Sequence, residues 1–134
     1  GGTVFPFPNM ARKRGGSGTI EKAIAFISTT ALAPKVTLYL YKDIPVGINL
    51  NDNAANTGPD LTNIPNFVGQ VDFLAMEDLG GGSTSLVTMG TYGNLPLRYV
   101  CADRSLYGIA VTRDAITGEA AGMTLRFLLQ AAQD

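Results

Sequence analysis

The sequence predicts an all-β protein: an antiparallel β-sandwich that is jelly-roll-like and carries an extended N-terminal arm. Three observations lead to this prediction. Seven or eight short segments alternate apolar and polar residues with the period of two that is typical of strands. Glycine, proline, asparagine and aspartate gather between these segments, as turns require. No stretch of ten or more residues shows an uninterrupted helical period, which argues against an α/β fold.

Residues 1–19 predict the arm, because their composition differs from that of the rest of the chain. They contain five glycines, two prolines and three basic residues, and no acidic residue. The prolines fix φ and favour extended backbone at Phe5 and Phe7, while the glycines supply a flexible joint. The alternative is a disordered tail, but such tails seldom carry aromatic residues. We expect the arm to bind a partner through Phe5, Phe7, Arg12, Lys13 and Arg14.

Charge also separates the arm from the body, which we place at residues 20–134. The arm carries a charge of +3, whereas the body has seven basic and eleven acidic residues, hence −4. Opposite charges in one chain favour an arm that lies on a neighbouring body. The three basic residues could also hold phosphate, but without side chains that read bases they would bind nucleic acid only weakly and nonspecifically.

The body is expected to begin with two strands. In residues 20–27 the alternation places four residues on one face: Ile20, Lys22, Ile24 and Phe26. Helix is the alternative there because alanine is frequent, but the polar residues and the proline that follow favour a strand. Residues 35–42 alternate more clearly. Their two faces comprise Val36, Leu38 and Leu40 on one side and Thr37, Tyr39 and Tyr41 on the other.

A long polar connection, residues 43–65, is expected next, with a short strand near 46–50 as a possible interruption. Its many Asn, Asp, Gly and Pro residues favour turns. A loop of this length in a compact domain usually has a function or a partner. The remaining strands are expected at 67–75, 83–89, 97–102, 106–113 and 123–130, with a flexible turn at 80–82 and a loop at 115–122.

The composition argues against most enzyme chemistry and favours a structural or binding role. The chain has 134 residues, which suits one domain. Only 16% of them are charged, against about 25% in an average domain. The lack of histidine excludes a Ser-His-Asp triad, a Cys-His pair and every His-containing zinc site. A single cysteine excludes an internal disulfide, and no apolar run approaches the ~20 residues of a membrane span.

Two pairs of carboxylates could serve a glycosidase, which needs two facing acids. Glu77 and Asp78 are adjacent and precede a glycine-rich turn, so solvated loop residues are the better interpretation. Asp72, the possible partner of Asp103, alternates away from Phe73, as a residue on the wet face of a strand does. We therefore expect no catalytic residues and no enzyme activity.

Other polar groups could bind a ligand, but each has a simpler explanation. Asn51, Asp52, Asn53 and Asp60 could gather oxygens for Ca²⁺, yet their spacing does not match an EF-hand and turn formation explains them. The run from Gly80 to Ser83 lacks the Gly-Lys-Ser/Thr sequence and the helix of a phosphate-binding loop. Cys101 lies in an apolar strand and is expected to be a small buried residue. We expect no cofactor and no metal, and leave open whether the Asn/Asp-rich loop binds one.

Tyr39 and Tyr41 share one face of the strand at 35–42. If exposed, they would form an aromatic platform for a sugar or a protein. If buried, they would belong to the second side of a covered sheet. We favour burial in a subunit contact, which makes these two tyrosines a possible oligomer face.

Several pieces of the body occur in an order that carries a family resemblance. They are VTLYLYKDIP, NLNDNAANT, FVGQVDF, LYGIAVTRDA and MTLRFLLQAAQD. With these pieces, residues 20–134 resemble a family of small proteins encoded near the major capsid gene in tailed bacteriophages. Its pattern runs "LxLYLF", "DNAAF", "xxGxVxF", "LYGxLVxRDA" and "LTLRLxxxQD". The chain departs from it at Ala131 and Ala132, and the N-terminal arm is less characteristic of the family.

The resemblance implies a virion structural protein of the capsid decoration, or cement, class. Such proteins are similar to small β-sandwiches that bind the outer surface of the shell and brace it. The expected partner is the major capsid protein, together with further copies of the chain, a trimer being favoured and a dimer possible. Neither nucleic acid nor a membrane is expected as a partner. We expect the protein on the capsid surface of the virion, after synthesis in the host cytoplasm. The alternative is a phage receptor-binding or carbohydrate-binding module that stacks sugars on Tyr39, Tyr41 and Tyr92.

Overall fold

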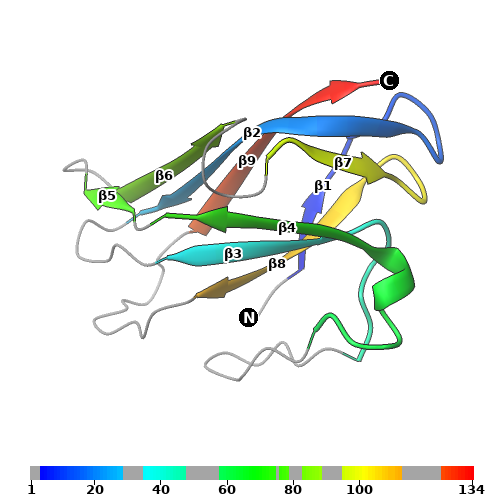
Figure 1. The fold of residues 1–134 in the computed structure, drawn as a ribbon, viewed down its shortest axis with the longest axis horizontal. Helices are drawn as coiled ribbons and strands as arrows, with labels where there is room; N and C mark the ends of the chain where they lie inside the picture. The colour runs from blue at the N-terminus through cyan, green and yellow to red at the C-terminus, as the bar shows by residue number, and fades with distance from the viewer. Residues whose placement is uncertain are drawn as a thin grey trace.

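The computed structural model describes residues 4–28, 35–47, 58–74, 76–78, 83–88, 95–112 and 125–134. Within these residues the chain forms nine β-strands and one 3₁₀ turn, η1 (Ile64–Asn66), and the strands make two antiparallel sheets (Figure 1). The all-β, sandwich-like architecture expected from the alternating sequence is therefore confirmed. No helix in this part of the chain has the length and apolarity that a membrane span requires.

Sheet A has four strands, in the order β1-β8-β3-β4, and lies below sheet B in Figure 1. Its strands are β1 (Val4–Phe7), β3 (Val36–Tyr41), β4 (Phe67–Phe73) and β8 (Leu106–Thr112). All six residues of β3 are buried, because the strand is central in the sheet and apolar on both faces.

Sheet B has five strands and is built around β2, the longest of them. β9 pairs along one side of β2, while β6 and β7 share the other side, and β5 pairs with β6. These strands are β2 (Ser17–Ile27), β5 (Glu77–Asp78), β6 (Ser83–Thr88), β7 (Leu97–Val100) and β9 (Leu125–Gln133).

A β-bulge at Glu21 reverses the side-chain alternation of β2. Ile20 pairs with Ala131 and Lys22 pairs with Gln130, so β2 has one residue more than β9 at this point. As a result Ile20 faces the core together with Ala23, Ala25 and Ile27. The predicted face that grouped Ile20 with Lys22, Ile24 and Phe26 is wrong, because a strict period of two cannot register an inserted residue.

The core lies between the two sheets and is formed mainly by aliphatic side chains of β2, β3, β4 and β8, with Tyr99 and Cys101. A second, smaller cluster covers the other face of sheet A. Tyr39, Tyr41 and Ile109 form its centre, and Val4, Phe67 and Val111 pack against it. Sheet A is therefore buried on both faces over its middle strands.

The N-terminal segment, expected as an arm apart from the body, is part of the sandwich over its described residues. β1 pairs with β8, from Val4 opposite Ile109 to Phe7 opposite Leu106, and forms one edge of sheet A. β2 already begins at Ser17, three residues before the expected start of the body at Ile20. Proline biases this segment towards extended backbone, as predicted, but the extended backbone joins the chain's own sheet.

Candidate functional site

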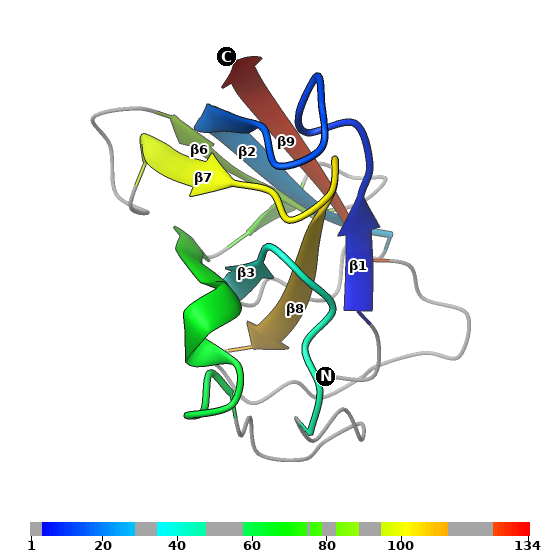
Figure 2. The ribbon, with the colours of Figure 1, turned by 90° about the vertical axis from the view of Figure 1, so that its right-hand side faces the viewer.

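Four connections meet at one end of the sandwich and form what we call the loop end: residues 8–16, 42–47, 58–66 and 101–105. Figure 2 shows them side by side, facing the viewer. Backbone hydrogen bonds join them in series. The Gly15 amide donates to the Asp103 carbonyl at 2.9 Å, the Ala102 amide to the Lys42 carbonyl at 3.4 Å, and the Lys42 amide to the Asn66 carbonyl at 2.8 Å. The loop end is therefore one connected surface.

The first of these connections, residues 8–16, holds three consecutive basic residues in a fixed loop. The amides of Met10 and Ala11 both donate to the Arg104 carbonyl, at 2.8 and 3.3 Å, and both side chains are buried. Beyond them the chain returns to the body through Gly15, whose φ of +71° suits a residue without Cβ. Between these two anchors lie Arg12, Lys13 and Arg14, all exposed.

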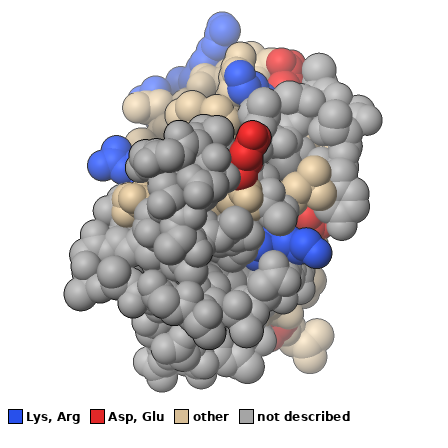
Figure 3. Space-filling view, turned by 90° about the vertical axis from the view of Figure 1, so that its left-hand side faces the viewer, with Lys and Arg blue, Asp and Glu red and all other residues tan. Residues whose placement is uncertain are grey.

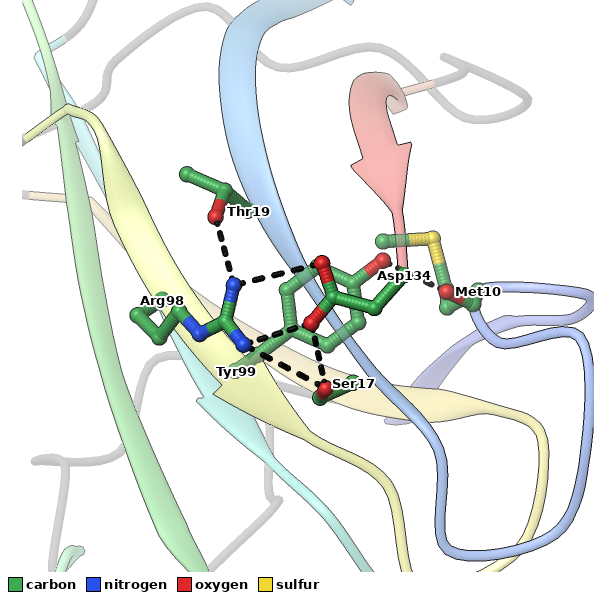
Figure 4. A network of polar contacts seen from close by, with 6 residues as sticks. All are labelled: Met10, Ser17, Thr19, Arg98, Tyr99 and Asp134. Atoms are coloured by element: carbon green, nitrogen blue, oxygen red, sulfur yellow. Dashed lines mark hydrogen bonds and ion pairs between the residues drawn. The ribbon is translucent and has the colours of Figure 1, made fainter.

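Tyr99 fastens this basic loop to sheet B from inside the molecule. Its hydroxyl donates to the Met10 carbonyl, and the side chain is buried. The ring fits over Gly18, its register partner on β2, where a Cβ would lie 2.4 Å from the hydroxyl. Burial raises the pKa of Tyr99, so the hydroxyl remains a donor. Figure 4 shows that Tyr99 points to the opposite side of the strand from its neighbour Arg98.

Asp103 organises the connection that faces the basic loop. Its carboxylate accepts from the Ser105 amide at 2.6 Å and from the Tyr107 hydroxyl at 3.0 Å. The Ser105 amide, helped by Tyr107 and by the charge of Arg14, holds the pKa of Asp103 below its ordinary value. The same bond to Asp103 raises the pKa of Tyr107. Asp103 is therefore ionised and hydrogen-bonded as part of a turn.

Asn63 joins the other two connections of the loop end. The Asn63 side-chain amide donates to the Val46 carbonyl at 2.7 Å and accepts from the Val46 amide at 3.0 Å. It thus pairs with Val46 as a neighbouring strand would. Asp60 accepts from both the backbone and the side-chain nitrogen of Asn63, each at 2.9 Å. Asn63 is itself buried, and the hydrogen bonds of this clamp are partly buried.

Around this clamp the chain exposes aliphatic side chains. Leu61 is 92% exposed and Val46 is 60% exposed, and Ile44 and Ile64 are exposed as well. These four belong to a set of seven large exposed apolar residues in the described part of the chain. Exposed apolar groups that cluster in this way mark interaction sites. The sequence indicated residues 43–65 only as a polar connection and did not single out these four residues. Their aliphatic side chains within a turn-rich stretch were the one feature that could have indicated a binding surface.

The loop end therefore combines apolar and basic groups on one rigid surface. Its basic residues are Arg12, Lys13, Arg14, Lys42 and Arg104, and its acidic residues are Asp43, Asp60 and Asp103. The whole chain, by contrast, has a net charge of −1. Figure 3 shows the opposite end, where the described charged side chains in view include both basic and acidic ones. The arrangement suits a partner that offers an apolar centre with acidic groups around it.

Phe5 and Phe7, which we grouped with the basic residues, lie elsewhere. Both are on β1, half-buried, and pack against the core of their own chain. The Phe5 ring meets that of Phe127 on β9 edge-to-face, with centroids 5.2 Å apart. The structure thus separates the aromatic part of the expected partner site from its basic part.

Tyr39 and Tyr41 lie in the smaller cluster that covers the other face of sheet A. They are 8% and 0% exposed within the single chain and pack against Phe67. The second side of sheet A is therefore covered within the chain at these two residues, which is the alternative that we gave for buried tyrosines, and a subunit contact at this face stays a prediction. Tyr92, the third tyrosine of the sugar-binding alternative, lies outside the described residues.

Of the two carboxylate pairs considered for catalysis, the structure describes both side chains only for Asp72 and Asp103, and these two lie far apart. Asp72 accepts from Thr37 at 2.8 Å and from Gln70 at 3.1 Å, towards the end of β4 that is remote from the loop end and Asp103. Glu77 is exposed on β5, and the side chain of its neighbour Asp78 lies outside the described residues.

Some of the remaining candidate residues lie within the described part of the chain, and the others lie outside it. Cys101 is buried, and burial raises the pKa of its thiol, which disfavours the thiolate. Asp60, from the possible calcium loop, takes part in the Asn63 clamp. The rest of that loop, Asn51 to Asn53, lies outside the described residues, as do Gly80 to Gly82 and the side chain of Ser83.

A second polar cluster lies on the outer face of sheet B, where Arg98 of β7 meets Asp134 (Figure 4). Arg98 also approaches Thr19 at 3.4 Å, and Ser17 donates to Asp134 at 2.6 Å. The hydrogen bonds from Ser17 and Arg98 hold the pKa of Asp134 below its ordinary value. Both partners of the ion pair are largely exposed, so this cluster chiefly ties the residue after β9 to β2 and β7.

Comparison of the chain with protein-family models, with curated proteins and with solved structures gives no match.

Proposed function

We propose that the protein is a bacteriophage capsid decoration protein and that its loop end binds the outer surface of the major capsid shell. We assign the chain a binding role on the virion and no reaction. The observation that carries the proposal is the loop end itself, where exposed Ile44, Val46, Leu61 and Ile64 lie on the same connected surface as five basic residues.

The rigidity of the loop end supports a role in binding. Association loses less conformational entropy when the contacting segments are already ordered. Here the basic loop is held by Arg104 and Tyr99, and the apolar residues are held by the Asn63 clamp. A shell partner with acidic groups around an apolar centre would therefore meet a preformed surface.

The sequence resemblance and the architecture also support the proposal. The pieces that resemble the phage family form much of the sandwich: VTLYLY is β3, FVGQVDF is β4 and LYGIAVT is β8. Jelly-roll-like connectivity belongs to the proposal as well. What supports it is that β1 pairs with β8 and β2 with β9, so that strands from the two ends of the chain are neighbours in both sheets.

The contribution that we propose for the N-terminal segment is narrower than a free arm. Arg12, Lys13 and Arg14 would contact the shell from the clamped loop, while Phe5 and Phe7 support the sandwich. Deletion of residues 1–18 would remove β1 and the anchor of Tyr99, so point substitutions give the sharper test.

Binding to purified shells that lack their decoration protein tests the proposal. Leu61→Ser and Lys13→Glu should each weaken shell binding at least about fivefold, since a residue central to an interface carries about 1 kcal/mol or more. Two controls change the same chemistry away from the loop end: Leu74→Ser, on an exposed residue after β4, and Lys22→Glu, on β2.

Each outcome has a defined meaning. Wild-type protein that binds shells and raises their heat resistance, with loss only in the loop-end variants, supports the proposal. Equal loss in the control variants would place the contact elsewhere. Wild-type protein that ignores shells overturns the function.

A further inference from the structure

Among the described strands, β9 forms an open edge of sheet B, and its C-terminal end adjoins the loop end, where the Gln133 side chain donates to the Asn9 carbonyl at 2.6 Å. It pairs with β2 along its length, from Gly18 opposite Gln133 to Ile27 opposite Leu125. No strand among the described residues pairs with its other side. On that side, alternate N–H and C=O groups of the strand are left for another strand to bind.

This edge lacks the features that protect other edges of the molecule. β1, at one edge of sheet A, contains Pro6, and β4, at the other, has a register shift next to Gly69. β9 has nine residues, LRFLLQAAQ, without proline or glycine and with Arg126 as its one charge. Proteins that remain monomeric usually interrupt such an edge with proline, charge or a bulge.

The hydrophobic core is incompletely covered along the same edge. Leu125, Phe127, Leu129 and Ala131 of β9 pack on the core, yet each is only half-buried. The inward residues of the neighbouring β2 are, by contrast, buried. On the outer face of β9, Leu128 is 63% exposed. A strand added here would satisfy the backbone and cover these apolar side chains together.

We propose that two copies of the chain pair antiparallel through β9, so that the two five-stranded sheets continue into each other. Charge favours this occupant. Arg126 and Asp134 are exposed, opposite in sign, and lie at the two ends of the segment. A twofold axis at Gln130 places Arg126 of each copy opposite Asp134 of the other, and Leu128 opposite Ala132. Asp134 already accepts from Ser17 and Arg98, but a carboxylate has about four acceptor positions.

The twofold pairing favours a dimer over the trimer that we expected from the family resemblance. It does not rest on the proposed function, because it requires only the free edge and its sequence. If both hold, the dimer carries two loop ends to the shell, and shell binding gains from two simultaneous contacts.

Sedimentation of the full chain over a range of concentrations tests the pairing without any shell. Wild-type protein should form a dimer. Gln130→Lys places two like charges opposite each other at the axis and should raise the dissociation constant at least about tenfold. Thr62→Lys adds the same charge at an exposed residue of the loop end and should leave the dimer unchanged. Thermal unfolding of both variants shows whether each is folded.

A cross-linking variant checks the register. Gln130→Cys should give a disulfide-linked dimer under mild oxidation, because residues that face each other at an antiparallel axis bring their Cβ atoms to about 5 Å. Thr62→Cys is the matched control, and Cys101 is buried and should not react. A monomer at every concentration, a trimer, or a dimer that resists Gln130→Lys and does not cross-link would each overturn the pairing. Because no shell is present, these outcomes are independent of the proposed function.

Discussion

The hydroxyl of Tyr99 donates a hydrogen bond to the backbone carbonyl of Met10, from a side chain that is buried between sheet B and the basic loop. This bond joins a strand of the sandwich to the segment that presents Arg12, Lys13 and Arg14. The position of three surface charges therefore depends on one interior hydroxyl. Tyr41, the other fully buried tyrosine, has a hydroxyl without a hydrogen-bond partner among the described residues, and the two residues form a natural comparison.

Tyr99→Phe should destabilise the protein and loosen the basic loop. The substitution keeps the ring over Gly18 but leaves the Met10 carbonyl without this donor, which costs about 1–3 kcal/mol for a buried group. Chemical denaturation should show the loss in the free energy of unfolding. Hydrogen exchange should become faster at the amides of Met10, Ala11 and Gly15. Unchanged exchange at these amides would show that the hydroxyl does not hold the loop.

Tyr41→Phe should have the opposite effect on stability. Its hydroxyl is buried, and no residue in the described part of the chain pairs with it. Burial raises the pKa of Tyr41 to about 12, with smaller contributions from Asp60 and Tyr39. Removal of an unsatisfied buried hydroxyl should raise the free energy of unfolding by about 1 kcal/mol. The measurement is the same denaturation experiment as for Tyr99→Phe. A destabilised Tyr41→Phe would mean that this hydroxyl has a partner in solution.

Asn63→Asp should disrupt the clamp that holds the apolar part of the loop end. The replacement is nearly isosteric, but it loses the nitrogen that donates to Val46 and to Asp60, and it brings a second carboxylate next to Asp60. We expect a loss of about 1–3 kcal/mol in unfolding free energy and weaker shell binding. The control is Asn66→Asp, which makes the same substitution in the same turn but outside the clamp. Equal stability of the two variants would contradict the role assigned to Asn63.

Stability should fall at acid pH because two aspartates have lowered pKa values in the folded protein. For Asp103 the main cause is the Ser105 amide, and for Asp134 it is the Ser17 hydroxyl. A carboxyl group whose pKa is lower in the folded protein than in the unfolded chain stabilises the protein at pH values above its pKa in the unfolded chain. That stabilisation should therefore be lost as pH falls from the ordinary 3.8 through the folded pKa. Thermal unfolding between neutral pH and pH values below 3.8 measures it. Asp103→Asn should be less stable at neutral pH and should show a shallower decrease on acidification; an unaltered acid profile would rule out Asp103 as a source.

Most of the strands could be predicted from the sequence because they alternate and end at turn residues, whereas the bulge at Glu21 interrupts the alternation of β2. β3 and β8 show this best, since Val36 to Tyr41 and Leu106 to Thr112 are nearly continuous runs of residues that favour strands. Which sheet the N-terminal segment joins could not be predicted in the same way. Phe5 and Phe7 look alike whether the extended segment pairs with its own sheet or with a neighbour, because strand pairing is a tertiary property.

The candidate site was only partly predictable. The basic residues are conspicuous in the sequence, but their fixed loop depends on contacts with Tyr99 and Arg104, more than eighty positions away in the chain. Leu61 and Val46 gave little signal within a polar connection, and Asn63 appeared to be one more turn former. Their association comes from a side-chain clamp that no local pattern encodes. The burial of Tyr39 and Tyr41 required knowing that both faces of sheet A are covered.

The pairing of β2 with β9 has a consequence for how the protein is made. During synthesis β2 leaves the ribosome early and can find β6 and β7, but its other side must wait for the last strand of the sequence. Until β9 has been synthesised, one side of β2 is unpaired. The β9 strand of another copy of the protein has the same sequence and could pair there. Crowded polysomes would thus favour exchange of the final strand between chains, and a chain truncated before β9 would remain receptive to that strand supplied as a separate peptide.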